Sequence, residues 1–248
     1  GSISDGLNII TLRKENNSLW TLSGHSTFSG NVAVDDGVLE ISHTNALGSG
    51  AKILYIAGDA GASRIPELRL SGGISPTVSE LQISGAGEDN LTGALRNISG
   101  DNTFNATTQV TMRTGNGGTT LHSDAGTLTL NTPLVTSNAT GRVLILSGPG
   151  NGVINGVIAN GSTTNLPVTK NGAGTWTLNG AHTYSGATTV NGGTLALGQA
   201  SLDDAAPVVI AAGATLHLNF SGTDRVGSLT VGGVPKADGL YSATTDPG

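Results

Sequence analysis

The stretch that decides the fold runs from Lys170 to Leu197 and reads KNGAGTWTLNGAHTYSGATTVNGGTLAL. It contains two short blocks, Thr175–Leu178 and Thr194–Leu197, with apolar residues at their second and fourth positions. Such alternation predicts a β-strand with one buried face. Glycines separate the blocks and supply the positive φ angles that tight turns need. The stretch therefore predicts short strands that alternate with glycine turns.

A second copy of this unit lies at Lys14–Ile41, near the start of the chain. Trp20-Thr21-Leu22 falls on Trp176-Thr177-Leu178, and a weaker third copy spans Ile98–Phe104. Trp20 and Trp176 share the parity of the apolar strand residues, so both are expected in the core. Internal repeats of this kind are typical of solenoids, in which each coil packs on a copy of itself.

The repeats predict an all-β protein, a β-solenoid of roughly 10–12 coils at about 20 residues each, forming one elongated domain over residues 1–248. No stretch has the period of a helix. A β-sandwich is the alternative, although it does not require similar repeats. Gly1-Ser2 has the form of a cloning scar, and residues 231–248, rich in Gly, Pro and Asp, are expected to form a C-terminal cap.

Composition restricts the partners. The net charge is −6 and no Lys/Arg cluster is longer than Arg13-Lys14, so nucleic acid and anionic membranes are not expected as partners. The absence of cysteine excludes disulfides and thiolate sites. No apolar run approaches the roughly 20 residues of a membrane-spanning helix. We expect a monomer rather than an obligate oligomer.

Lys170–Leu197 resembles the autotransporter-associated β-strand repeat, also called the passenger-associated transport repeat, and Lys14–Ile41 is similar in a degraded form. The segments Thr92–Gly100 and Ser123–Leu130 are similar to the repeat-rich surface proteins that carry these units, and Val231–Ala243 resembles their usual ending. The resemblance implies a right-handed parallel β-helix, export, and a location outside the cell or on the bacterial outer-membrane surface. An outer-membrane translocator would then lie outside this sequence. The family brings no catalytic residues.

Motifs for catalysis and for metal or cofactor binding are missing. There is no Gly-x-Ser-x-Gly elbow, P-loop or Gly-x-Gly-x-x-Gly, and the five histidines show no His-x-x-x-His spacing, so no metal or cofactor is expected. Gly85–Leu91 partly matches a calcium-binding turn, but it occurs once, where that motif works in tandem. We interpret it as an acidic turn, with calcium as the alternative.

One outward face is the most suggestive candidate for ligand binding. If Ile53–Ile56, Glu67–Leu70 and Glu80–Ile83 stack on successive coils, five side chains share that face. They are Tyr55, Glu67, Arg69, Glu80 and Gln82. An aromatic ring, a guanidinium and an amide in a row suit a sugar or a peptide, and they suit an ordinary cation–π contact equally well.

The sequence thus favours a non-enzymatic stalk or passenger module, structural or adhesive, with a glycan, matrix or host-surface ligand as partner. A carbohydrate-active β-helix enzyme and a carbohydrate-binding module are the alternatives. Glycosidase chemistry needs two carboxyl groups about 5–9 Å apart. Only Glu67 and Glu80 are candidates for such a pair, and a solvated ladder with Arg69 explains them as well.

Overall fold

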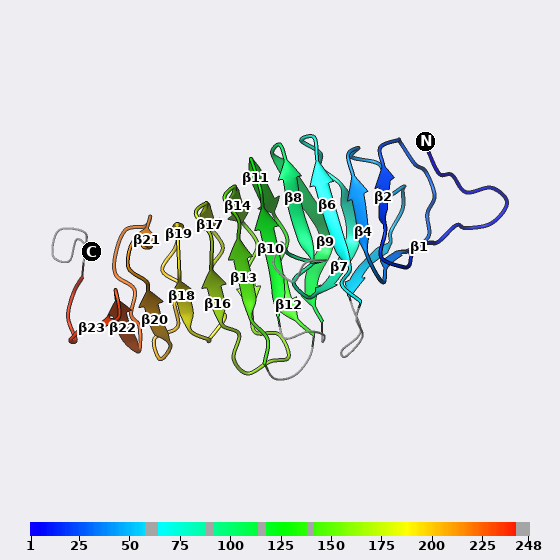
Figure 1. Ribbon diagram of the computed structural model, residues 1–248. Helices are drawn as coiled ribbons and strands as arrows, with labels where there is room; N and C mark the ends of the chain where they lie inside the picture. Colours follow the sequence, from blue (N-terminus) through cyan, green and yellow to red (C-terminus); the bar gives the residue numbers. More distant parts are fainter. Residues whose placement is uncertain (58–63, 88–91, 114–117, 138–140, 242–248) are drawn as a thin grey trace.

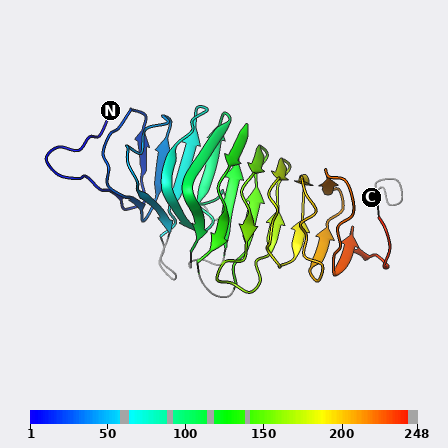
Figure 2. The ribbon, with the colours of Figure 1, turned by 180° about the vertical axis from the view of Figure 1, so that it is seen from behind.

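The computed structural model describes residues 1–57, 64–87, 92–113, 118–137 and 141–241. These described residues form β-strands and no helix, and the parallel strands stack into an elongated solenoid (Figures 1 and 2). The all-β solenoid expected from the repeats is therefore confirmed. None of the described segments is a long apolar helix of the kind that crosses a membrane.

The strands line three faces, which we call A, B and C. Face B contains β2 (Leu19–Leu22), β4 (Val38–Ile41), β6 (Glu67–Ser71), β8 (Leu95–Ser99), β10 (Thr119–Ser123), β13 (Leu144–Ser147), β16 (Val168–Lys170), β18 (Thr188–Val190), β20 (Pro207–Ile210) and β22 (Ser228–Val231). Face A contains β1 (Leu12–Lys14), β3 (Val32–Val34), β5 (Ile53–Ala57), β7 (Thr77–Ser84), β12 (Leu134–Thr136) and β15 (Ile158–Ala159). Face C contains β11 (Thr127–Leu130), β14 (Asn151–Ile154), β17 (Thr175–Leu178), β19 (Thr194–Leu197) and β21 (Thr215–Leu218).

Faces A and C meet at β9 (Asn102–Met112), which belongs to both. Its residues Asn102 to Phe104 pair with β11 on face C, whereas Val110 to Met112 pair with β12 on face A. Face A therefore dominates the N-terminal half and face C the C-terminal half. All three faces carry strands in the middle coils.

Among the described residues, face B carries ten parallel strands, one per coil, which lies at the lower end of the ten to twelve coils expected. The expectation assumed a constant step of about 20 residues, at the short end for solenoid repeats. The structure has a step of 20 between Asn171 and Asn191, but one of 29 between Glu80 and its register partner Gln109. The longer coils of the middle region use up more of the chain per turn.

Aliphatic rows fill the interior because inward residues of successive coils lie directly above one another. On face B the row consists of Leu39, Leu68, Leu95, Leu121 and Leu146, all 0% exposed. On face C it consists of Phe104, Leu130, Ile154, Leu178 and Leu197, also fully buried. Removal of these rows from water stabilises the stack.

Two glycines show how tightly the coils pack. A Cβ on Gly174 would lie 1.8 Å from the carbonyl oxygen of Gly150, so the turn before β17 has no room for a side chain. A Cβ on Gly152 would lie 2.2 Å from the ring of Trp176, which is fully buried directly above it. Glycine at these two positions is a packing requirement.

The two ends differ from the interior. Trp20, expected in the core, is 40% exposed, because β2 is the first strand of face B and pairs with β4 only. At the other end β23 (Val234–Pro235) pairs antiparallel with β22. Residues 242–248 lie outside the described ranges, so a cap over 231–248 stays a prediction.

Candidate functional site: a polar row on face B

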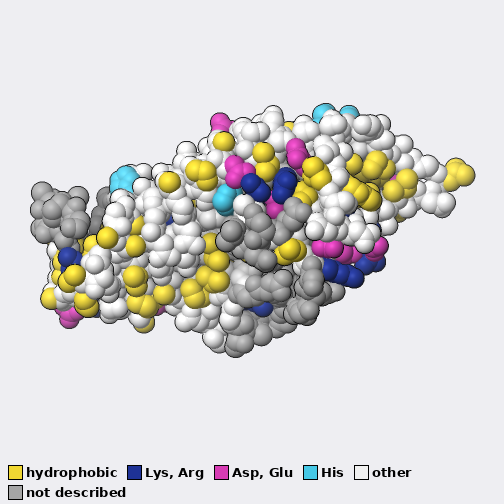
Figure 3. All heavy atoms as spheres, in the orientation of Figure 1, with side chains coloured by type: hydrophobic (Ala, Val, Ile, Leu, Met, Phe, Trp, Pro, Cys, Tyr) yellow, Lys and Arg dark blue, Asp and Glu magenta, His cyan; other side chains and the backbone are white. Residues whose placement is uncertain are grey.

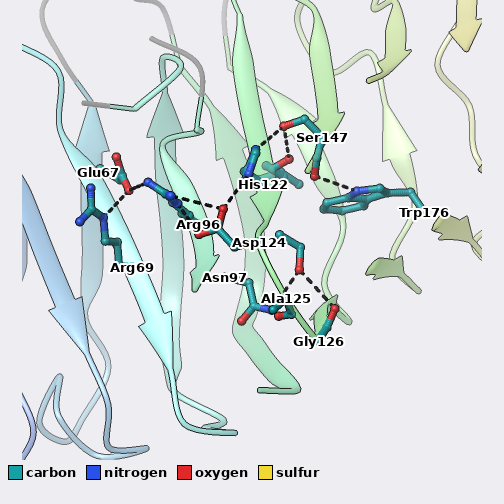
Figure 4. A network of polar contacts seen from close by, with 12 residues as sticks. Glu67, Arg69, Arg96, Asn97, His122, Asp124, Ala125, Gly126, Ser147 and Trp176 are labelled. Carbon is teal, nitrogen blue, oxygen red and sulfur yellow. Dashed lines mark hydrogen bonds and ion pairs between the residues drawn. The ribbon is translucent and has the colours of Figure 1, made fainter. Parts of the chain in front are cut away.

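Outward side chains on face B form a polar row across successive strands. Register places them in the order Thr21, Glu40, Arg69, Arg96, His122 and Ser147. Charged side chains gather on this part of the surface (Figure 3), in a protein in which only 11% of residues are charged. Figure 4 shows the central contacts of the row at close range.

Glu67, two residues before Arg69 on β6, is a fully buried anion beside this row. Its Oε1 lies 2.6 Å from Nε of Arg69, two residues along the same strand, and 3.6 Å from Nη1 of Arg96 on the next strand. Both arginine side chains are only about one-fifth exposed. A buried carboxylate requires such partners, because its transfer from water is costly unless opposite charges and hydrogen bonds replace the solvent.

Asp124 continues the network on the far side of Arg96. Arg96 donates from Nε to Oδ2 of Asp124 at 2.7 Å and from Nη2 to Oδ1 at 3.3 Å. His122 lies beside this carboxylate, with Nε2 3.0 Å from Oδ1 of Asp124. Its other nitrogen, Nδ1, is 2.9 Å from Oγ of Ser147. His122 therefore bridges an anchored carboxylate and a hydroxyl on the neighbouring strand.

Buried polar contacts fix the backbone beneath this row. Asn97 is fully buried and donates from Nδ2 to Oγ of Ser123 at 3.0 Å and to the carbonyl of Ala125 at 2.7 Å. Trp176 donates from Nε1 to the carbonyl of Ser147 at 3.2 Å. These bonds hold the turn after β10 and the end of β13 in place, and thereby position Asp124 and Ser147 (Figure 4).

Buried lysines form a second recurring feature, which the sequence reasoning missed. Lys170 is 0% exposed and its Nζ donates to the carbonyls of Asn171 and Gly172 in its own turn, at 2.9 and 2.8 Å, and of Gly192 one coil further, at 3.0 Å. Lys14, also 0% exposed, contacts the equivalent carbonyls of Glu15, Asn16 and Asp36. Each ammonium therefore links the turns of two successive coils.

The five candidate ligand-binding residues do not form the single face expected from the sequence. Tyr55, Glu80 and Gln82 lie on β5 and β7 of face A, whereas Glu67 and Arg69 lie on β6 of face B. The short steps between the three blocks are therefore passages between faces and not whole coils. Glu67 and Glu80 accordingly do not form a carboxylate pair, and a ligand-binding role for the five residues stays untested.

On face A, Tyr55 and Gln82 are direct register partners, and both contact Arg113. The Arg113 guanidinium carbon lies 6.0 Å from the centroid of the Tyr55 ring, and its Nη1 donates to Oε1 of Gln82 at 2.8 Å. The cation–π interpretation of Tyr55 therefore holds, with Arg113 in place of Arg69. Glu80 accepts hydrogen bonds from Thr111 and Gln109.

An open groove lies near the N-terminal end, at the turns between faces B and A. It measures about 330 Å³ and is lined by His25, Ser26, Thr44, Asn45, Gly48, Ser49, Gly50, Ser75 and Thr77. The rings of His25 and His43 stack with centroids 5.7 Å apart. The described residues contain no group of three or more His, Cys, Asp or Glu that could hold a metal. The expected acidic turn at Gly85–Leu91 falls partly outside the described residues.

Sequence reasoning missed the His122–Asp124–Ser147 contact because it treated the histidines as scattered. His122 and Ser147 are 25 residues apart, which is one coil in this region. The coil length of 25 residues would have predicted the contact, but that length comes from the strand register of the structure and no local sequence pattern contains it.

Comparison with protein families matched the passenger-associated transport repeat twice, at residues 12–41 and 168–197. Curated proteins and solved structures gave no match. The two matched segments have strands at equivalent positions, but the first unit runs over faces A and B and the second over faces B and C. This solenoid therefore carries two passenger-associated transport repeats, the unit found in autotransporter passenger proteins, which indicates a secreted or surface-exposed protein.

Proposed function

We propose that this chain is a structural stalk of a bacterial autotransporter passenger, which holds other parts of the protein away from the cell and contacts a glycan through the groove near its N-terminal end. The solenoid fold and the two repeats support the stalk. The glycan contact rests on a separate observation, the uncharged polar lining of that groove.

The main support for a stalk comes from which positions the two repeats have in common. Inward positions are identical or similar in the two units, as in the pairs Lys14/Lys170, Leu22/Leu178, Val34/Val190 and Leu39/Leu195. Several outward positions differ, as in Arg13/Thr169, Ala33/Thr189 and Glu40/Ala196, although the outward pair Thr21/Thr177 is shared. Most of the strand positions that the repeats share therefore serve stacking between coils, and a single shared outward threonine is too little for a recognition site.

A one-coil deletion tests the stalk. Trp176 and Leu195 are register partners, so removal of residues 176–194 joins two equivalent points of the stack. A stalk should remain folded, keep its β-type circular dichroism spectrum and become shorter by about 4.8 Å in solution scattering. The matched control removes residues 176–185, about half a coil, and should disrupt the fold. A compact particle for the intact chain, or equal damage from both deletions, would overturn the stalk.

The glycan contact rests on the chemistry of the groove. Among the described residues that line it, the polar side chains are hydroxyls, the amide of Asn45 and the imidazole of His25, with no carboxylate, lysine or arginine. Uncharged hydrogen-bonding groups around glycine-lined backbone suit the hydroxyls of a neutral sugar better than an anionic one. Binding to a glycan array that falls on replacing Asn45 by Ala, but not on replacing Tyr55 by Ala, would support the groove. Unchanged binding in the Asn45 variant would contradict glycan binding in this groove.

A further inference from the structure

Ser147, His122 and Asp124 form a linear relay on the outside of face B. The strands β10 and β13 are parallel and place His122 directly opposite Ser147. Asp124 follows His122 by two residues, just beyond β10, and lies on the same outward side. The three groups are joined by contacts of 2.9 and 3.0 Å, which are ordinary hydrogen-bond lengths.

The contacts assign the proton on the imidazole. A carboxylate is an acceptor, so Nε2 of His122 donates its hydrogen to Asp124. Neutral imidazole then has a lone pair on Nδ1, which accepts the hydrogen of the Ser147 hydroxyl in preference to the more distant carbonyl of Leu121, 3.4 Å from Oγ. The order carboxylate, imidazole and hydroxyl is that of an activated serine, with the roles of the two ring nitrogens exchanged relative to the usual triad.

Surrounding contacts hold each member of the relay in place. Arg96 binds both oxygens of Asp124, which fixes the orientation of that carboxylate. Trp176 binds the carbonyl of Ser147 from the interior, so the serine backbone is anchored on its buried side. The histidine side chain is 12% exposed and that of Asp124 is 27% exposed. The relay is therefore rigid and reaches the surface.

We propose that Ser147 is a nucleophilic serine, with His122 as its general base and Asp124 as the residue that orients the base. Ser147 is 7% exposed, which restricts its reagents to small acyl or phosphonyl groups such as acetyl esters. This activity is independent of the stalk, since the relay lies on the outer surface and the stack depends on inward residues.

The chemistry balances without any further reactant. Oγ of Ser147 attacks the ester carbonyl carbon while its proton moves to Nδ1 of His122. The bond from the carbonyl carbon to the alcohol oxygen then breaks, and the proton on Nδ1 passes to the departing alkoxide. The products are acyl-Ser147 and a free alcohol, and His122 returns to its neutral form with Nε2 still bonded to Asp124.

The test uses the whole chain, with p-nitrophenyl acetate and an alkyl fluorophosphonate as probes. The expected result is release of p-nitrophenol, with one acetyl or phosphonyl group per chain located on Ser147 by peptide mass spectrometry. Ser147→Ala should abolish labelling, and His122→Asn should slow it about 100-fold or more, the usual contribution of a general base. Ser185→Ala and His217→Asn are the matched controls and should label like the wild type.

Asp124→Asn tests the orienting role. An amide in this place can donate to Nε2, which would move the imidazole hydrogen to Nδ1 and remove the base. Nitrogen NMR of His122 should report this change of tautomer together with slower labelling, at an unchanged circular dichroism spectrum. The proposal is overturned if the folded wild type does not label, if His122→Asn labels Ser147 at the wild-type rate, or if the label is found at other residues and persists in Ser147→Ala.

Discussion

Replacement of Lys170 by methionine should be among the most damaging single changes to the solenoid. Methionine keeps the apolar stem but removes the three hydrogen bonds from Nζ to the carbonyls of Asn171, Gly172 and Gly192. Each carbonyl left without its partner costs at least about 1 kcal/mol. Three such carbonyls give an expected loss of about 3 kcal/mol in the free energy of unfolding.

Urea denaturation followed by circular dichroism measures this loss. Thr169→Met is the matched control, because Thr169 is the outward neighbour on the same strand and surface changes are usually within about 0.5 kcal/mol. A loss below about 1 kcal/mol for Lys170→Met, or an equal loss for Thr169→Met, would refute the role of the ammonium in linking the coils.

The same lysine predicts a rise in stability at alkaline pH. Burial lowers the pKa of Lys170 to about 8, from 10.5, and that of Lys52 likewise. Between these values the unfolded chain binds more protons than the folded chain, so the free energy of unfolding increases with pH from about 8 to 10.5. In Lys170→Met the increase should shrink, because only Lys52 still contributes. An identical increase in both proteins would contradict this assignment.

Three further changes test other parts of the structure. Gly152→Ala should destabilise the fold by about 2 kcal/mol, because the new methyl group meets the Trp176 ring. Urea denaturation measures this loss, and Gly6→Ala, where a Cβ would meet no neighbour, is the control. Burial lowers the pKa of His182 to about 4, from 6.5, and its Nδ1 accepts the backbone N–H of Ile158. The free energy of unfolding should therefore fall as the pH drops from about 6.5 to 4, because the unfolded chain binds more protons in that range. His182→Gln should make this fall smaller when unfolding is measured at a series of acid pH values. Glu67→Gln should cost about 2 kcal/mol in thermal or urea unfolding, because it removes the charge from the hydrogen bond with the partly exposed Arg69 and from the contact with Arg96. An unchanged stability would show that the buried carboxylate does not stabilise the fold.

The sequence determined the kind of fold. Alternation in Thr175–Leu178 and Thr194–Leu197, glycine turns and internal repeats were enough to predict stacked strands with Trp176 and Leu195 inside. These are local properties, because a strand's buried face follows from parity, and the need for self-similar coils follows from stacking.

Only the tertiary structure decided which strands are neighbours. Arg69 and Gln82 are close in sequence yet lie on different faces, whereas His122 and Ser147, 25 residues apart, are in contact. Coil length differs along the chain, as the register partners Asn171 and Asn191 or Glu80 and Gln109 show, and it depends on how many residues each corner takes up. Alternation fixes the side to which a residue points, but lateral neighbours depend on the sum of all corner lengths in a turn, and no local pattern contains that sum.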